Sequence, residues 1–192
     1  TGTATFDSAN AGSRTATAQT VSLANGTGLA SNYSLSAGQT DTATIAKANL
    51  IVTGSEVYDS TTSFLPSNLI ITGVNGQTFT ATGTATLSSA NVQTNQPLSS
   101  ISLTLSGVSG ASTSNYNTLT VSQTSVSVTP KTLTASMIAA DKTYDGTTTA
   151  TPTFTISGLI GSQTLVVTGT ATFDSANAGS RTATAQTVSL AN

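Results

Sequence analysis

The sequence contains no cysteine, no histidine and no tryptophan. These absences exclude disulfide bonds, thiolate chemistry, imidazole metal ligands and histidine-based catalytic triads. The few acidic residues are dispersed along the chain and form no paired-carboxylate pattern of the kind that acid–base catalysis needs. We therefore expect a protein that is not an enzyme and that carries no cofactor and no metal.

Charge is also scarce. Only 6% of the residues are charged and the net charge is −2, whereas roughly 25% charged residues is usual in soluble domains. The five cations form no basic stripe, so we expect no nucleic-acid partner. The longest apolar runs, such as residues 69–71, are far shorter than a membrane span, so we expect no membrane insertion.

The residues that are present favour β-strands. Threonine is the commonest residue, and small polar residues alternate with apolar ones over residues 78–87, 100–107 and 119–129. The glycine-containing segments 74–77 and 158–163 lie between such runs and are typical of tight turns. These patterns predict an all-β protein made of small antiparallel β-sandwich modules of Ig-like architecture, with a β-grasp-like module as the alternative.

An exact repeat defines the modules. Residues 1–25 are identical to residues 168–192, and weaker copies of the same motifs recur at about half of that spacing. Two module types, which we call A and B, therefore alternate. Residues 1–46 are the C-terminal part of an A module, residues 47–130 are a complete B module, and residues 131–192 are the N-terminal part of the next A module.

A Tyr-Asp pair lies near the start of each module: Tyr58 and Asp59 in B, and Tyr144 and Asp145 in A. The tyrosines are interpreted as core or corner residues, with a sugar-stacking face as the alternative. The aspartates are interpreted as turn caps, because a calcium site requires more oxygen ligands than this acid-poor sequence offers.

A second recurring pair is Asn-Tyr. It occurs as Asn32 and Tyr33 in "SNYSL" and as Asn115 and Tyr116 in "SNYNTL". We expect the asparagine amides to tie a loop to the backbone.

Two lysines begin their modules at matching positions, Lys47 and Lys131. A Lys-to-Asn isopeptide bond promoted by a buried carboxylate is one hypothesis for them. The alternative is a solvated charge at a module junction that protects an edge strand from pairing with other chains.

Three motifs carry a resemblance to a known family. The segments "DKTYDGTTTAT" at 141–151, "ATFDSANAGSRTAT" at 171–184 and "NYSL" at 32–35 before "TATIAK" resemble the YDG and MBG-type repeats of large bacterial surface proteins, including filamentous-haemagglutinin-like adhesins. Module B departs from the pattern, since Ser60 replaces the glycine found at Gly146 and residues 92–93 are Val-Gln where residues 178–179 are Ala-Gly.

The resemblance implies a structural repeat segment of an extracellular adhesin or surface fibre, an elongated stalk on the bacterial cell surface. The alternative function is a glycan- or surface-binding β module. The expected partners are neighbouring modules of the same chain or identical subunits. Because residues 1–46 and 131–192 are complementary parts of one module type, we also expect that strand donation between subunits can build a fibre.

Overall fold

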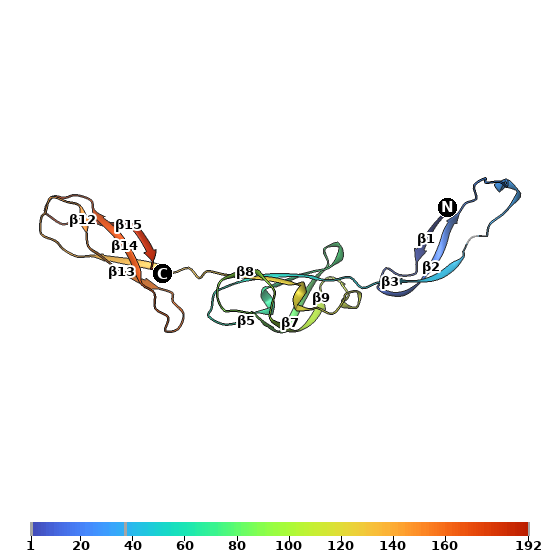
Figure 1. Ribbon diagram of the computed structural model, residues 1–192, viewed down its shortest axis with the longest axis horizontal. Helices are drawn as coiled ribbons and strands as arrows, with labels where there is room; N and C mark the ends of the chain where they lie inside the picture. The colour runs from blue at the N-terminus through green and yellow to red at the C-terminus, as the bar shows by residue number, and fades with distance from the viewer. Residues whose placement is uncertain (1, 37, 192) are drawn as a thin grey trace. The chain divides into compact units, whose positions relative to one another are not determined.

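The computed structural model describes residues 2–36 and 38–191; Thr1, Ala37 and Asn192, which belong to the sequence modules, lie outside the described residues. The chain divides into two compact units, Thr1–Thr129 and Pro130–Asn192. Both are built from β-strands, and helical structure in the described residues is limited to 3-10 turns of three residues each. The predicted all-β, sandwich-like class is confirmed (Figure 1).

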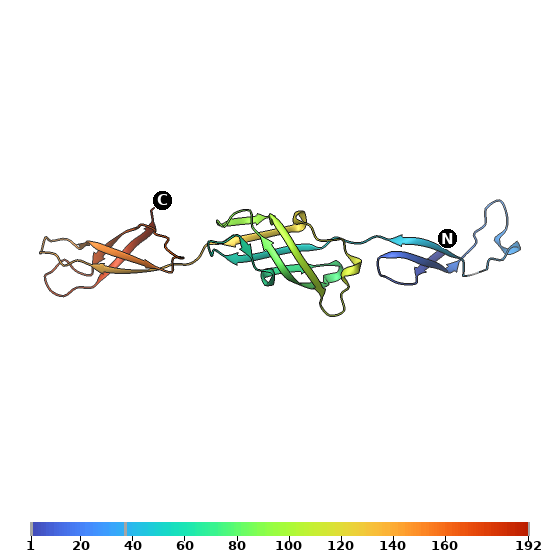
Figure 2. The ribbon, with the colours of Figure 1, turned by 90° about the horizontal axis from the view of Figure 1, so that it is seen from below.

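The first unit contains two sheets. Three strands form a small antiparallel sheet in the order β1-β2-β3, with bounds Gly2–Phe6, Gly12–Val21 and Thr40–Ile45. The B module forms a seven-stranded sheet in the order β5-β7-β6-β4-β10-β8, with β9 paired to β7. Figure 2 shows its strands in cyan, green and yellow. Its strands are β4 (Ile51–Val57), β5 (Ser63–Phe64), β6 (Leu69–Thr72), β7 (Thr78–Thr86), β8 (Gln93–Gln96), β9 (Ser100–Gly107) and β10 (Thr124–Thr129).

The second unit also contains two small sheets. One pairs β11 (Thr134–Ala139) with β13 (Pro152–Ser157). The other has the order β12-β14-β15, with bounds Thr149–Ala150, Val167–Phe173 and Ala183–Leu190.

One strand pair differs from the antiparallel expectation. β4, the first strand of the B module, pairs in parallel with β10, the last strand, from Val52 opposite Thr124 to Val57 opposite Thr129. Every other strand pair in the described part of the chain is antiparallel. Because neighbouring first and last strands run in the same direction, the chain enters the B module at one end of the sheet and leaves at the other.

The hydrophobic core lies in the B module. Alternate residues of β10, Thr124, Val126 and Val128, are buried, as the period of two predicts. Val126 and Val128 pack with the buried side chains of the other strands and loops into one cluster: Leu50, Val52, Phe64, Leu69, Ile71, Phe79, Ala85, Leu87, Leu98 and Tyr116. Outside the B module, the buried hydrophobic residues of the described chain are Ala150 and Ala171. Within the described residues, the segments 2–45 and 130–191 therefore have strands but almost no core.

Glycine marks the same strand position in all three modules. A Cβ atom on Gly83 of β7 would lie 2.1 Å from the carbonyl oxygen of Ser102, and the backbone of Gly83 has a positive φ of 118°. Matching contacts of 2.3 and 2.2 Å exist at Gly2 and Gly169. Each of these glycines lets the neighbouring strand approach more closely than any side chain permits.

Candidate functional site

The Tyr-Asp motif forms the same turn in both modules. Asp145 accepts hydrogen bonds from the backbone N–H and the hydroxyl of Thr147, both at 2.9 Å. Asp59 accepts the equivalent bonds from Thr61 at 2.8 and 2.9 Å. An aspartate that bonds the residue two positions later closes an Asx-type turn. The carboxylates are thus engaged in shaping the backbone.

Lys142 holds the turn of the second unit together. Its ammonium group lies 2.8 Å from Asp145 Oδ1 and donates to the carbonyl oxygens of Thr147 at 2.8 Å and of Thr149 at 3.0 Å. It also lies 5.8 Å from the centre of the Phe173 ring, within the range of a cation–π interaction. The hydrogen bond from Lys142, reinforced by the Thr147 amide and hydroxyl, lowers the pKa of Asp145 to about 2.

The B module has the opposite charge at the matching position. Glu56 stands two residues before Tyr58, as Lys142 stands two residues before Tyr144. Partial burial raises the pKa of Glu56, and repulsion from Asp59 adds to that effect, while a hydrogen bond from the Leu65 N–H opposes it. The two modules therefore share the turn but not its electrostatics.

The four tyrosines differ in burial. Tyr116 is 5% exposed and Tyr58 packs at the edge of the same core, whereas Tyr144 is 66% and Tyr33 is 70% exposed. In the described part of this unit the buried hydrophobic residues are Ala150 and Ala171, and the ring of Tyr144 is not packed in a core. The corner interpretation of Tyr144 stays a prediction.

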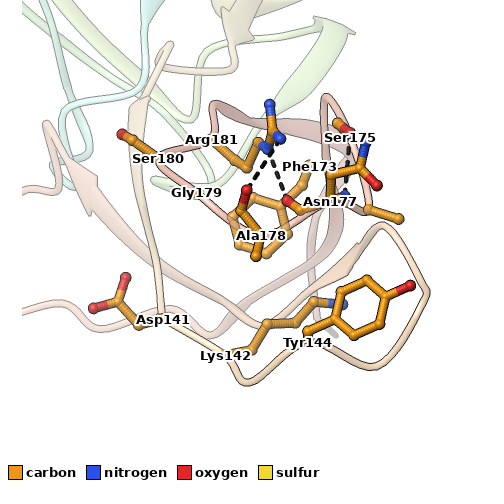
Figure 3. Close-up of a pocket in the computed structure, with 11 residues that line it drawn as sticks. Asp141, Lys142, Tyr144, Phe173, Ser175, Asn177, Ala178, Gly179, Ser180 and Arg181 are labelled. Atoms are coloured by element: carbon orange, nitrogen blue, oxygen red, sulfur yellow. Dashed lines mark hydrogen bonds between the residues drawn. The ribbon is translucent and has the colours of Figure 1, made fainter.

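A hollow of about 340 Å³ lies beside the Tyr-Asp turn of the second unit. Figure 3 shows Tyr144 and Lys142 on one side of it and Arg181, Asn177 and Ala178 on the other. Arg181 donates from Nε to the carbonyl of Asn177 at 2.9 Å and from Nη2 to that of Ala178 at 3.3 Å. Both cations of the hollow are thus held by protein oxygens, and the ring of Tyr144 lines it with an exposed aromatic surface.

The Asn-Tyr loops have the same backbone turn. The N–H groups of Asn32 and Asn115 each donate to the carbonyl three residues earlier, at 3.1 and 3.3 Å. Only Tyr116 reaches the core, where its ring packs edge-on against Phe79 at 5.1 Å and its hydroxyl accepts the N–H of Val74 at 2.9 Å.

The remaining sequence candidates do not gather into a site. Lys47 and Lys131 are both exposed and precede their first strands, and the ion pair recorded among the described residues is that of Lys142 with Asp145. No group of three or more metal-ligating side chains occurs in the described part of the chain. None of its helices is long and apolar enough to cross a membrane.

Sequence reasoning overlooked Lys142, Glu56 and the two arginines, Arg14 and Arg181. A signal existed for the arginines, because Arg14 and Arg181 follow the same Ser-Ala-Asn-Ala-Gly segment. The sequence around Lys142 did not predict that its ammonium group would donate hydrogen bonds to the carbonyl oxygens of the turn.

Comparison with known proteins found one family, and its match falls on the second unit. No curated protein matches the chain. No solved structure matches it either. The family model of the YDG domain matches residues 129–192, which contain the Tyr-Asp turn, Lys142 and the Arg181 loop. Residues 129–192 are a YDG domain.

Proposed function

We propose that the chain is a structural repeat segment, an elongated stalk or spacer of an extracellular bacterial adhesin or surface fibre. The observation that carries this proposal is the parallel pairing of β4 with β10, which puts the entry and the exit of the B module at opposite ends. Modules connected in this way extend a chain instead of folding it back. The residues from Lys47 to Tyr58 would advance it by about 36 Å if fully extended, at about 3.3 Å per residue.

The surface composition supports the same role. Strands such as β9 expose serine and threonine and turn leucine and isoleucine partly inward. A surface wetted by hydroxyl groups, with few ionic interactions to screen, keeps its properties over a wide range of salt concentration. We propose a structural role without catalysis and a location on the bacterial cell surface.

Small-angle scattering on arrays of two, four and six whole modules tests the stalk. The expected result is a rod whose length grows by a constant increment for each module. A compact particle, or a flexible one whose size grows as that of a random chain, contradicts the proposal. Labelling of intact cells with an antibody against the B module tests the location.

The proposed partners are neighbouring modules or identical subunits that complete the A module. In the B module β4 pairs on both sides, with β6 and β10, whereas the matching strand β11 of the second unit pairs with β13 alone among the described strands. The equivalent of β10 is β3, because β3 pairs with Gly12–Thr17 as β10 pairs with β8. A peptide of residues 38–46 titrated into the chain should shift the NMR signals of β11. The absence of any shift would contradict strand donation.

Glycan binding is the second candidate function, favoured by the exposed ring of Tyr144 beside the hollow in Figure 3. An aromatic face next to amide and guanidinium donors suits a pyranose ring. NMR titration with a glycan panel tests this function. Saturable shifts that vanish in Tyr144→Ala but persist in the control Tyr33→Ala would support it, and a panel without shifts would discard it.

A further inference from the structure

The Ser-Ala-Asn loop recurs in all three modules with one conformation. In each copy the asparagine N–H donates to the serine hydroxyl two residues earlier, at 3.1 Å for Asn10, 3.1 Å for Asn91 and 3.2 Å for Asn177. Arg14 fixes the first copy by donating from Nε to the carbonyl of Asn10 at 2.8 Å and from Nη2 to that of Ala11 at 3.1 Å. The conformation of the loop is thus fixed by its own hydrogen bonds and does not depend on contacts with another module.

The first copy of this loop is occupied by the B module. The N–H of Ala11 donates to Asn115 Oδ1 at 2.9 Å, and Asn115 Nδ2 donates to Asn10 Oδ1, also at 2.9 Å. The two bonds join residues more than 100 positions apart within the first unit. They border a hollow of about 300 Å³ lined by Ile45, Ala48 and Tyr116 among others.

Asn115 is held rigidly from the B-module side. Its carbonyl accepts the N–H of Ala48 at 3.0 Å, and the N–H of Asn117 donates to the carbonyl of Ala48 at 2.8 Å. The next residue, Tyr116, is anchored in the core. The asparagine amide is therefore oriented before it meets the loop, which reduces the entropy lost on forming the pair.

We propose that the Ser-Ala-Asn loop of one module and the Asn-Tyr loop of the following module are the two halves of a repeated docking surface that fixes the angle between modules. The partner of the loops at residues 89–91 and 175–177 is then the Asn-Tyr loop of a further module. Asn32 stands at the matching position of the A type and has the same backbone turn as Asn115. This inference rests on the proposed tandem stalk.

The B-type loop keeps the groups that the docking needs. Val92 and Gln93 replace the Ala-Gly that follows the asparagine in the A type, yet the backbone N–H at residue 92 and the Asn91 amide remain. Gln93 donates to the carbonyl of Ser89 at 3.4 Å, so a side chain also supports the loop in the B type, although at a different carbonyl from those that Arg14 binds. Substitution in the repeat thus preserves the donor and the acceptor used by Asn115.

The test measures the junction in the chain itself. Because the chain has no cysteine, nitroxide labels can be placed at Thr42→Cys and Thr104→Cys, which are exposed residues on either side of the junction. Pulsed electron resonance then gives the distribution of distances between them. We expect the doubly labelled chain to give a single narrow peak in this distribution. The same labelled chain with Asn115→Ala should lose the narrow peak.

A matched pair of variants separates docking from folding. Asn10→Ala and Asn177→Ala alter the same residue of identical loops, but only Asn10 contacts Asn115. We expect Asn10→Ala to broaden the distribution and Asn177→Ala to leave it narrow, with unchanged thermal unfolding of the B module in both. A broad distribution in the unchanged chain, or equal distributions in the two variants, overturns the inference. Array scattering tests the stalk separately: a rod together with a broad distance distribution overturns only the docking inference, whereas a compact array together with a narrow distribution contradicts only the stalk.

Discussion

Replacing Tyr116 with phenylalanine removes one hydroxyl group from the hydrophobic core of the B module. That hydroxyl donates to Gln77 Oε1 and accepts the N–H of Val74 at 2.9 Å. The ring stays in place against Phe79, because a phenylalanine has the same shape. The variant therefore isolates the polar contacts of the Asn-Tyr loop from its packing.

The expected loss of stability follows from the hydrogen bonds that Gln77 and the Val74 N–H lose. A hydrogen bond contributes about 0.5–1.5 kcal/mol net, and a buried donor left without a partner costs about 1–3 kcal/mol. The contact between Tyr116 and the Val74 N–H is part-buried, so water replaces only some of what is lost. We expect Tyr116→Phe to lower the free energy of unfolding of the B module by about 2 kcal/mol.

The chain provides its own control. Tyr33 occupies the matching position of the other Asn-Tyr loop and is 70% exposed, so Tyr33→Phe should change stability by less than about 0.5 kcal/mol. Urea unfolding followed by the NMR methyl signals of Leu98 and Val126 reports on the core directly. Equal effects of the two substitutions, or a loss below about 0.5 kcal/mol for Tyr116→Phe, would refute the reasoning.

Two further predictions concern backbone and charge. Gly83→Ala should destabilise the B module by about 2–4 kcal/mol, because the added carbon would lie 2.1 Å from the Ser102 oxygen and the backbone has a positive φ. The control is Gly26→Ala, which has open space around it and should leave the free energy of unfolding unchanged in the same urea assay. The lowered pKa of Asp145 adds stability that is complete above its ordinary pKa of 3.8 and is lost as the pH falls through about 2. Lys142→Met should raise the pKa of Asp145 toward 3.8, measured by carboxyl carbon NMR; an unchanged pKa contradicts the assigned cause.

The strands were readable from the sequence, but their partners were not. The alternation over residues 78–87 and 100–107 corresponds closely to β7 and β9. The run at 119–129 begins instead with a 3-10 turn, Val121–Gln123, because Thr120 and Gln123 form a capping box. A period of two describes one strand's faces and carries no information on direction, which is why the parallel pairing of β4 with β10 escaped prediction.

In the Tyr-Asp and Asn-Tyr motifs too, the local turn follows from the sequence but the burial of the tyrosine does not. Their turns depend on residues within three positions, and the structure has the same turn in each copy. Burial of the tyrosine depends on strands far away in the sequence, so Tyr116 and Tyr33 differ although their loops agree. The charge at position 56 or 142 likewise follows no local rule, since glutamate and lysine precede the same turn.

The exact repeat separates local from long-range determinants within one chain. The strand register, the irregularity after Thr3 and after Thr170, and the hydroxyl contacts of Thr3 with Thr20 at 2.9 Å and Thr170 with Thr187 at 3.0 Å all recur. Identical residues thus produce the same register without a shared core, although β2 begins at Gly12, where β3 pairs with it, and β15 begins only at Ala183. Local sequence alone therefore accounts for the hairpin of the repeat.

The exposure of the alanine at one position of the repeat decreases as more strands of its module surround it. Ala4, in the hairpin of residues 1–46, is exposed, whereas the identical position Ala171, where β12 pairs alongside, is 2% exposed. Ala85, the matching residue of the complete B module, is 3% exposed and belongs to the large core. Each added strand supplies apolar surface that the hairpin cannot supply to itself. On the proposed pairing of strands like β3 and β11, which would meet as β10 and β4 do, an A module would gain the core that its hairpin lacks.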